Sequence, residues 1–290
     1  MAKDYKCKHT ILNRIKVFEE IKHSNGISYD MLGFGTYKIT GEYDAKQAVL
    51  DALSVGYRRI DTAVFYENED RIGVALKETD IPRDKLFITT KLWTNVNSYE
   101  KVMAQVEKSM QALGVDYLDG LLIHWPHKDV KETWRAMEDL YLSGKLRSIG
   151  VSNFKEHHLE EMKDYQRVKP MINQIELHPE FRQFELVDYC KKEGILVEAW
   201  SPLMRGEALA LPLIKEIAKK HNVTEAEVII KWDIDEGIAV IPKSVKRERM
   251  ASNFNALNLD LENEEIEKLR TLNNGIRRYR DPDNHGFGNQ

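Results

Sequence analysis

The chain has 290 residues, and 42% of them are hydrophobic, which is enough for a sizeable buried core and excludes an intrinsically disordered chain. Its 43 basic and 47 acidic residues give a net charge of −4, which does not favour nucleic acid or an anionic membrane as a partner. No apolar run approaches the roughly 20 residues that span a bilayer. The first residues lack the apolar stretch of a secretory signal. The two cysteines, Cys7 and Cys190, exclude a disulfide scaffold and a four-cysteine zinc site, so we expect a cytoplasmic protein.

Strand-like and helix-like segments alternate along the chain without a linker or a break in composition, which predicts a single domain over residues 1–290. Short apolar, β-branched segments predict strands at Met31–Tyr37, Tyr57–Ala63, Leu86–Leu92, Tyr117–Trp125, Leu146–Ser152, Met171–Leu177, Ile195–Trp200 and Ile238–Pro242. Apolar residues at helical spacing predict helices at Asp44–Gly56, Glu67–Glu78, Ser98–Gly114, Lys131–Gly144, His157–Tyr165, Phe184–Gly194, Pro212–His221, Thr224–Asp235, Glu248–Asn255 and, as an extra C-terminal helix, Glu262–Asn273.

Eight strand–helix pairs favour a closed (β/α)8 TIM barrel, whose buried parallel strands are continuous apolar runs such as Leu121–Ile123. A doubly wound open sheet is the alternative, but Gly33–Lys38 lacks the third glycine of its dinucleotide-binding fingerprint. Before the barrel, Ile15–Ile21 and Ile27–Leu32 flank the turn Ser24-Asn25-Gly26, which is typical of a β-hairpin. We expect this hairpin to plug the N-terminal end of the barrel.

Polar or ionisable residues end nearly every predicted strand, and the carboxyl ends of barrel strands meet at the mouth where barrel enzymes carry their chemistry. Four of these residues have complementary titratable groups, namely Asp61, Tyr66, Lys91 and His124. Each one alone has an ordinary structural explanation, such as the return of the chain to solvent or packing in a loop. Together they favour a site of proton transfer.

Carbonyl reduction is the chemistry that suits these four side chains. A tyrosine hydroxyl has a pKa near 10 and is a poor acid, and a nearby ammonium lowers that pKa by about 1–3 units. We therefore expect Lys91 to lower the pKa of Tyr66, and Asp61 to keep the buried Lys91 charged. His124 would hydrogen-bond the substrate oxygen and orient it. A nicotinamide cofactor would supply the hydride, because no side chain can.

The motifs at these strand ends resemble those of the aldo-keto reductases. In chain order they are Asp61-Thr-Ala-x-x-Tyr66, Thr90-Lys91-Leu-Trp93, Leu122-Ile-His124-Trp-Pro126, Gly150-Val-Ser152-Asn153-Phe154, Trp200-Ser-Pro202-Leu203 and Ile241-Pro-Lys243-Ser244. The short C-terminal tail is similar to that of the compact bacterial branch, which reduces glyoxals and diketo-gluconate. The resemblance implies a monomeric, NADPH-dependent reductase of aldehydes and ketones with broad specificity for small carbonyl compounds.

The resemblance also implies roles for individual residues. It makes Asp61, Tyr66, Lys91 and His124 the catalytic residues, with Tyr66 as the general acid. The residues that it assigns to the nicotinamide and the pyrophosphate of NADP(H) are Ser152, Asn153, Gln174, Trp200, Ser201, Pro202 and Leu203. Those that it assigns to the 2′-phosphate and adenine end are Lys243, Ser244, Val245, Arg249 and Asn253.

The basic segment after the last predicted strand supports NADP over NAD, because barrels commonly bind phosphate after strands seven and eight. Cations there match a ribose 2′-phosphate, whereas an acidic residue would match a bare hydroxyl. The alternative is a solvated, basic start of a helix. For the substrate, Tyr37, Trp93 and Trp125 would line an apolar pocket that suits uncharged carbonyl compounds, unless they are ordinary core residues. Cations for an acidic substrate could come only from the tail, which carries Arg277, Arg278 and Arg280.

Two other functions fit a barrel of this kind. One is a non-catalytic barrel that binds NADPH and reports redox state to a partner, but the four complementary side chains at the mouth argue against it. The other is a metal hydrolase, but the sequence contains no His-x-His or His-Glu-x-x-His motif. We expect the adjacent His157 and His158 not to converge on one ion, and so expect no metal.

Overall fold

Eight parallel strands form one sheet in the computed structural model, which describes residues 20–22, 25–41 and 44–286. In chain order the strands are β3 (Phe34–Gly35), β4 (Arg59–Asp61), β5 (Phe87–Leu92), β6 (Gly120–Ile123), β7 (Ile149–Ser152), β8 (Ile172–Glu176), β9 (Leu196–Trp200) and β10 (Ala239–Val240). The sheet closes between its first and last strands, since the backbone N–H of Val240 donates to Met31 at 2.7 Å and that of Gly33 donates to Val240 at 2.8 Å. The prediction of a closed (β/α)8 barrel is therefore confirmed, with strands shorter than the apolar segments that predicted them.

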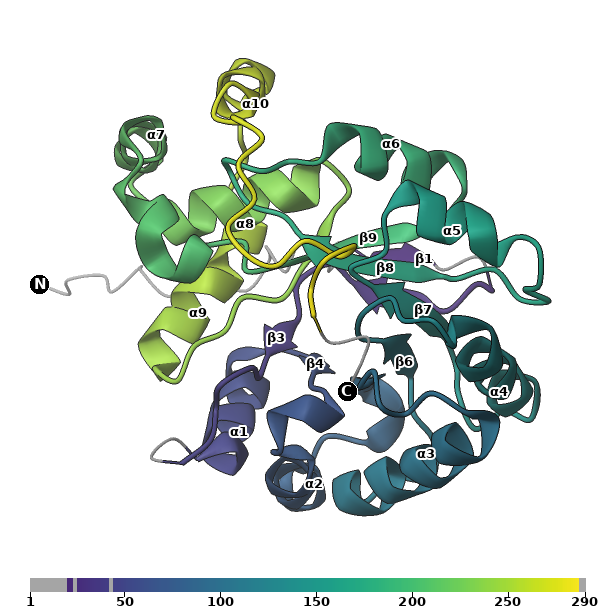
Figure 1. Cartoon of the computed structure of the whole chain (residues 1–290). Coiled ribbons are helices and arrows are strands. Elements are labelled where there is room, and N and C mark those ends of the chain that lie inside the picture. The colour runs from purple at the N-terminus through teal and green to yellow at the C-terminus, as the bar shows by residue number, and fades with distance from the viewer. Residues whose placement is uncertain (1–19, 23–24, 42–43, 287–290) are drawn as a thin grey trace, which may run out of the picture.

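The helices surround the strands, as Figure 1 shows. Their bounds are α1 (Ala45–Val55), α2 (Glu69–Glu78), α3 (Tyr99–Leu113), α4 (Val130–Leu142), α5 (Glu156–Met162), α6 (Phe184–Lys192), α7 (Pro212–His221), α8 (Glu225–Asp235), α9 (Arg247–Asn255) and α10 (Asn263–Arg270). The predicted extra helix is α10, which packs with α7 and α8 around a second apolar cluster that contains Ile214, Trp232 and Leu269. No described helix is long and apolar enough to cross a membrane.

The ends of α1 show how local sequence fixes a helix of the barrel. The side chain of Asp44 accepts a hydrogen bond from the backbone N–H of Lys46 and so caps the first turn. Gly56 ends the helix with φ of 132°, a conformation that favours glycine. A Cβ atom at Gly56 would also lie 2.7 Å from the ring of Phe254 on α9. The same glycine therefore ends α1 and permits the contact between the two helices.

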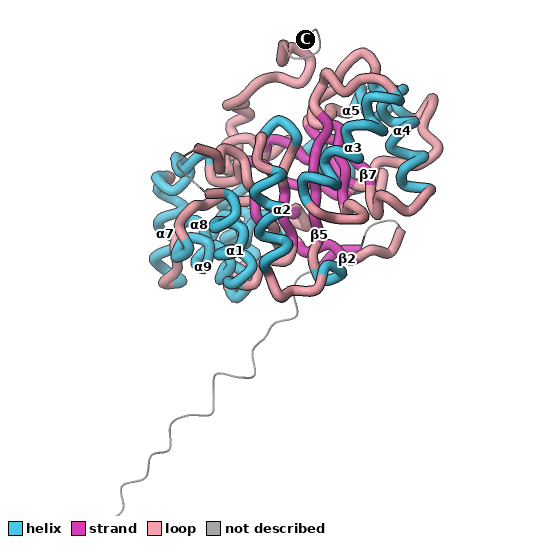
Figure 2. The backbone as a smooth tube through the Cα atoms, turned by 90° about the horizontal axis from the view of Figure 1, so that it is seen from below, coloured by secondary structure: helices cyan, strands magenta, loops and turns pink. Residues whose placement is uncertain are grey.

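A β-hairpin lies at the opposite end of the barrel from the last described residues of the chain, 275–286 (Figure 2). Strands β1 (Glu20–Lys22) and β2 (Ser28–Asp30) pair antiparallel, with Ile21 opposite Tyr29. Tyr29 is 1% exposed, and its hydroxyl donates to Glu198 inside the barrel at 2.5 Å. The predicted hairpin plug is confirmed within the described residues, whereas most of its predicted first strand, Ile15–Ile21, lies outside them.

Candidate active site

The barrel brings together the four titratable residues that the sequence singled out. Asp61 ends β4, Tyr66 lies in the short helical turn after it (Val64–Tyr66), Lys91 lies in β5, and His124 directly follows β6. The Lys91 ammonium donates to Asp61 Oδ1 at 2.6 Å, to the backbone carbonyl of Thr62 at 2.8 Å and to the Tyr66 hydroxyl at 3.4 Å. The rings of Tyr66 and His124 lie edge to face, with their centroids 5.7 Å apart. A hydroxyl, an ammonium and an imidazole thus meet at one end of the barrel.

Burial sets the charge state of each group in this cluster. Lys91 and Asp61 are 0% and 1% exposed. Burial alone would lower the pKa of Lys91, but the charge of Asp61 and the hydrogen bond to it raise the pKa, so the ammonium is retained. Burial raises the pKa of Asp61 although Lys91 opposes the change. Burial, with Lys91 adding to its effect, lowers the pKa of His124 well below its usual range and keeps the imidazole neutral.

Lys91 lowers the pKa of Tyr66 as expected, but the net shift of that pKa is upward. Burial raises the pKa of Tyr66 to about 12, and the Lys91 ammonium only partly offsets this effect. The pKa of Tyr66 rises overall because burial destabilises its phenolate form by more than the Lys91 ammonium stabilises it. Tyr66 therefore keeps its proton throughout the neutral pH range and can donate it, whereas little phenolate is present to accept a proton in the reverse direction.

Aromatic rings line the approach to Tyr66. Tyr37 lies 5.0 Å from Tyr66 between ring centroids and is 41% exposed. Trp93 packs edge to face against His124 at 5.1 Å. Phe65, which the sequence analysis did not select, stacks on Trp93 at 4.0 Å and is 45% exposed. Its position directly before Tyr66 was the only sequence signal for it. These rings give the mouth an apolar wall.

The residues expected at the nicotinamide form a hydrogen-bonded set beside this cluster. Ser152 donates to the backbone carbonyl of Gln174 at 2.9 Å, and Asn153 Nδ2 donates to the carbonyl of His124 at 2.9 Å. Trp200 Nε1 donates to Asn153 Oδ1 at 2.9 Å, which fixes the indole ring next to the amide. Asn153 has φ of 64°, a left-handed conformation that asparagine adopts more readily than most residues. Polar groups and an aromatic ring thus lie together at the ends of β7, β8 and β9.

The loop after β9 and the segment after β10 hold the remaining residues expected at the cofactor. Pro202 is buried, and Leu203 packs against both apolar clusters, so this loop is anchored to the core. Ser244 is 7% exposed, and its hydroxyl accepts from the backbone N–H of Lys246 at 3.0 Å, which shapes the turn into α9. Val245 also packs against the core.

The start of α9 forms the basic end of the site. Arg249 lies exposed in its first turn, and Asn253 is buried one turn further on. Burial lowers the pKa of Lys243, and the charge of Lys38 adds to this effect. Lys38, which the sequence analysis did not select, is thus a further candidate for binding an anion. The side chain of Lys246, the residue that precedes α9, makes no capping hydrogen bond to the first turn.

Residues 275–286, here called the C-terminal tail, run across the mouth of the barrel (Figure 1). The Tyr279 ring lies 5.0 Å from that of Trp200, and the Tyr279 and Ser201 hydroxyls are 2.8 Å apart. The His285 ring lies 5.1 Å from that of Trp125. Trp125 is only 8% exposed, so the tail covers it. Tyr279 and His285 are therefore residues of the mouth that the sequence analysis did not identify.

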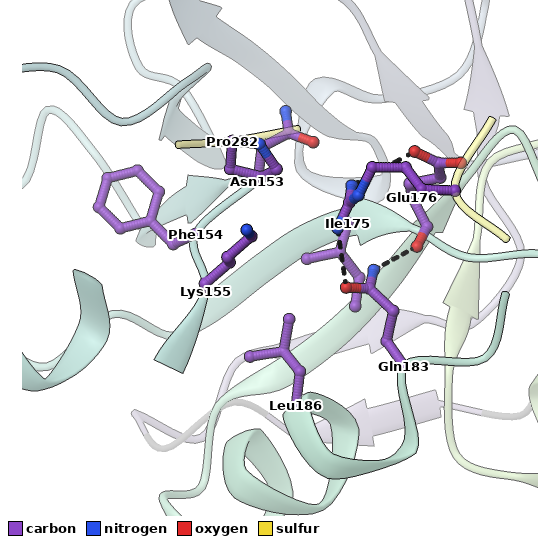
Figure 3. A pocket seen from close by; sticks show the side chains of 9 residues that line it. Asn153, Phe154, Lys155, Ile175, Glu176, Gln183, Leu186 and Pro282 are labelled. Atoms are coloured by element: carbon purple, nitrogen blue, oxygen red, sulfur yellow. Dashed lines mark hydrogen bonds and ion pairs between the residues drawn. The ribbon is translucent and has the colours of Figure 1, made fainter. Parts of the chain in front are cut away.

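The three arginines of the tail do not form a free cationic site. Arg277 pairs with Glu176 at 3.4 Å, Arg278 pairs with Glu180 at 2.5 Å, and Arg280 donates to the carbonyl of His285 at 2.5 Å. Arg277 and Arg278 thus tie the tail to residues outside it, and Arg280 bonds within the tail, so the suggestion that these arginines could offer cations to an acidic substrate stays a prediction. Under the tail lies a narrow crevice without room for a water molecule, lined by Asn153, Lys155, Glu176 and Pro282 among others (Figure 3).

His157 and His158 converge with a residue of the tail, which corrects the expectation that their side chains cannot point to one place, whereas the expectation of no metal stays a prediction. Ligand atoms of His157, His158 and Asp283 lie within 4.8 Å of one another. The Lys155 ammonium lies 2.7 Å from the same Asp283 carboxylate. His158 Nδ1 accepts from the backbone N–H of Lys155 at 3.1 Å, which places the proton of a neutral ring on Nε2. These contacts hold the tail against the start of α5.

Comparisons with known proteins agree with this geometry. The Aldo/keto reductase family model matches residues 31–274. The chain is 46% identical over 266 residues to the glyoxal reductase of Bacillus subtilis (strain 168), a match that covers 91% of this chain and 96% of that protein. The crystal structure of an aldo-keto reductase from a Medee basin deep-sea metagenome library gives a TM-score of 0.89 at 40% identity, covering 91% of this chain and 98% of that one. A mutant of Gox0644 solved in complex with NADPH gives 0.86 at 36% identity, covering 91% and 97%.

The barrel and the side chains at its mouth define an oxidoreductase that acts on carbonyl groups. The match over most of the chain shows that it belongs to the aldo/keto reductase family. Its similarity to the glyoxal reductase of Bacillus subtilis places it with the bacterial-type relatives that the sequence motifs indicated.

Proposed function

We propose that the protein reduces small aldehydes and ketones to alcohols with NADPH, and that Tyr66 donates the proton. The observation that carries this proposal is the Lys91 ammonium, which contacts Asp61 at 2.6 Å and Tyr66 at 3.4 Å beside the neutral His124. A tyrosine that keeps its proton near neutral pH suits the direction of reduction. The aromatic wall of Tyr37, Phe65 and Trp93 presents no charge, which supports broad specificity for uncharged carbonyl compounds.

The residues present fit NADPH. Trp200 offers an aromatic face beside Ser152, Asn153 and Gln174, whose amide and hydroxyl groups suit a carboxamide. At the other end, the cations of Lys38 and Lys243 and the start of α9 suit phosphate groups. Arg249 in the first turn of α9 would hold the 2′-phosphate. When bound, NADPH would supply the hydride for the carbonyl carbon.

The protein's own groups would position and protonate the substrate oxygen. His124, being neutral, can donate one hydrogen bond to that oxygen without adding charge. Tyr66 would transfer its hydroxyl proton to the same oxygen as negative charge develops there. Lys91 would stabilise the phenolate that remains, and Asp61 would keep Lys91 protonated. The apolar rings would exclude water, which strengthens each of these interactions.

The decisive experiment measures NADPH consumption by the purified protein before and after addition of glyoxal or methylglyoxal. We expect consumption only when the aldehyde is present, and loss of at least about 100-fold in kcat for Tyr66→Phe. Tyr189→Phe, which removes a hydroxyl that donates to Glu160 on the outer helices, is the matched control and should keep full activity. NADPH bound by wild type but never oxidised would instead favour a non-catalytic binding protein.

A further inference from the structure

A chain of buried polar side chains connects the candidate active site with the hairpin plug. Gln174 Nε2 donates to Asp61 Oδ2 at 2.9 Å and to Glu198 Oε1 at 2.5 Å. The other oxygen of Glu198 accepts from Tyr29 at 2.5 Å and from the Arg59 guanidinium. All five of these side chains are at most 2% exposed. They therefore lie inside the barrel, where each interaction is worth more than in water.

The Arg59 guanidinium is fully enclosed by the plug and the closing strand. Its Nε donates to the carbonyl of Asp30 at 2.8 Å, and its Nη2 donates to Met31 at 3.3 Å and to Val240 at 3.2 Å. A Cβ atom at position 33 would lie 2.6 Å from Arg59 Cζ, so Gly33 is needed to make room for this side chain. Backbone groups thus fix Arg59, and Arg59 in turn fixes the carboxylate of Glu198.

The two carboxylates determine which way the Gln174 amide faces. A carboxylate only accepts hydrogen bonds, so the atom that lies between Asp61 and Glu198 must be the amide nitrogen. Both of its N–H groups are then used, one for each carboxylate. The amide oxygen is the only polar atom of the Gln174 side chain that remains for a ligand. Without Glu198, Asp61 alone would hold the amide in this orientation, through one hydrogen bond instead of two.

We propose that Glu198, fixed by Arg59 and Tyr29, is a positioning residue that makes Gln174 present its amide oxygen to the carboxamide of the cofactor. Gln174 then accepts from the carboxamide NH2 group and favours a cofactor that has this donor. The same bonds hold Asp61 in place against Lys91. This inference rests on the proposed use of NADPH and adds to it the residues that select the nicotinamide carboxamide.

Two matched double variants isolate the hydrogen bond from the buried charges. Both replace Arg59 by Leu, so that no unpaired charge remains inside the barrel. Arg59→Leu with Glu198→Gln keeps an acceptor for Gln174 Nε2, whereas Arg59→Leu with Glu198→Leu removes it. Thermal unfolding followed by circular dichroism establishes that each variant is folded before binding is measured.

The readout is the ratio of two dissociation constants, one for NADPH and one for its acetylpyridine analogue. The acetyl group of the analogue has an oxygen but no N–H, so it lacks the donor that the Gln174 oxygen requires. We expect wild type and the double variant with Glu198→Gln to favour NADPH by about 2- to 12-fold, the worth of one hydrogen bond. The double variant with Glu198→Leu should show a smaller preference for NADPH than the one with Glu198→Gln, because only Asp61 still holds the Gln174 amide.

An unchanged ratio in the double variant with Glu198→Leu would overturn the proposal, and so would equal affinity of wild type for both cofactors. Wild type that binds neither cofactor would overturn the proposed function itself, which distinguishes the two failures. If the double variants do not fold, Tyr29→Phe tests the same chain, because it removes one hydrogen bond to Glu198 and no charge. It should reduce the preference for NADPH, and an unaltered ratio would contradict the positioning role.

Discussion

Replacing Lys91 by Met tests whether Lys91 and Asp61 at the barrel mouth depend on each other, both for the stability of the protein and for its reductase activity. Lys91 Nζ lies 2.6 Å from Asp61 Oδ1, and neither side chain is more than 1% exposed. Lys91→Met keeps the apolar stem and leaves Asp61 as a buried carboxylate whose remaining partner is the Gln174 amide. In the double variant with Asp61→Asn, the asparagine oxygen can still accept from Gln174, and no charge is left unpaired.

The structure sets the size of the effect. Removing one partner of a buried ion pair costs about 3–5 kcal/mol, whereas removing both is often nearly neutral. Because 1 kcal/mol shifts the Tm of a protein of about this size by roughly 2–4 °C, Lys91→Met should lower the Tm by about 6–20 °C near neutral pH. The double variant should recover most of this loss in stability, yet both should lose nearly all reductase activity.

The loss of stability in Lys91→Met should also depend on pH. Burial already raises the pKa of Asp61 in the folded protein, and removing Lys91 raises it further. A carboxyl group with a raised folded-state pKa contributes its stability below the unfolded-state value and loses it as the pH rises through the folded-state value. The difference in stability between Lys91→Met and wild type should therefore be small at acidic pH and increase towards neutral pH.

Circular dichroism melting at several pH values measures stability, and NADPH consumption with methylglyoxal measures activity. A double variant that is as unstable as the sum of the two single variants would refute the reasoning, because it would show that the two side chains do not stabilise each other. Activity retained by Lys91→Met would refute the role of the ammonium beside Tyr66.

Three further outcomes are expected. Tyr66→Phe should bind NADPH as wild type does while kcat falls by at least about 100-fold; weakened binding in fluorescence titration would show that the hydroxyl is structural. Arg249→Ala should weaken NADPH binding by about ten- to a hundred-fold and leave NADH binding unchanged, whereas Arg247→Ala, whose side chain bonds Ser54 on α1, should change neither. Equal losses for both cofactors in Arg249→Ala would argue against a 2′-phosphate contact. Burial raises the pKa of Asp233 on α8 to about 6, so its contribution to stability should be lost as the pH rises through that value; Asp233→Asn should flatten the pH dependence of the Tm, and an unchanged slope would contradict this assignment.

Local sequence determined the order of the elements and several of their ends. Helix and strand periodicities differ, so the alternation of segments predicted the barrel before any contact was known. Asp44 and Gly56 marked the ends of α1 because their capping interactions involve only near neighbours. The convergence of Tyr66, Lys91 and His124 was also predictable, since the carboxyl ends of all barrel strands face the same side.

Only the tertiary structure decided how those groups behave, because burial and partners distant in sequence set the energy of a charge. Lys91 was expected to make Tyr66 more acidic, but the desolvation of the hydroxyl outweighs that attraction. The arginines of the tail look free in the sequence, yet Arg277 pairs with Glu176, 101 residues away. Glu198 meets Gln174 and Arg59 only where their strands come together inside the barrel. Asp283 likewise meets His157 and His158 only because the tail folds back onto α5.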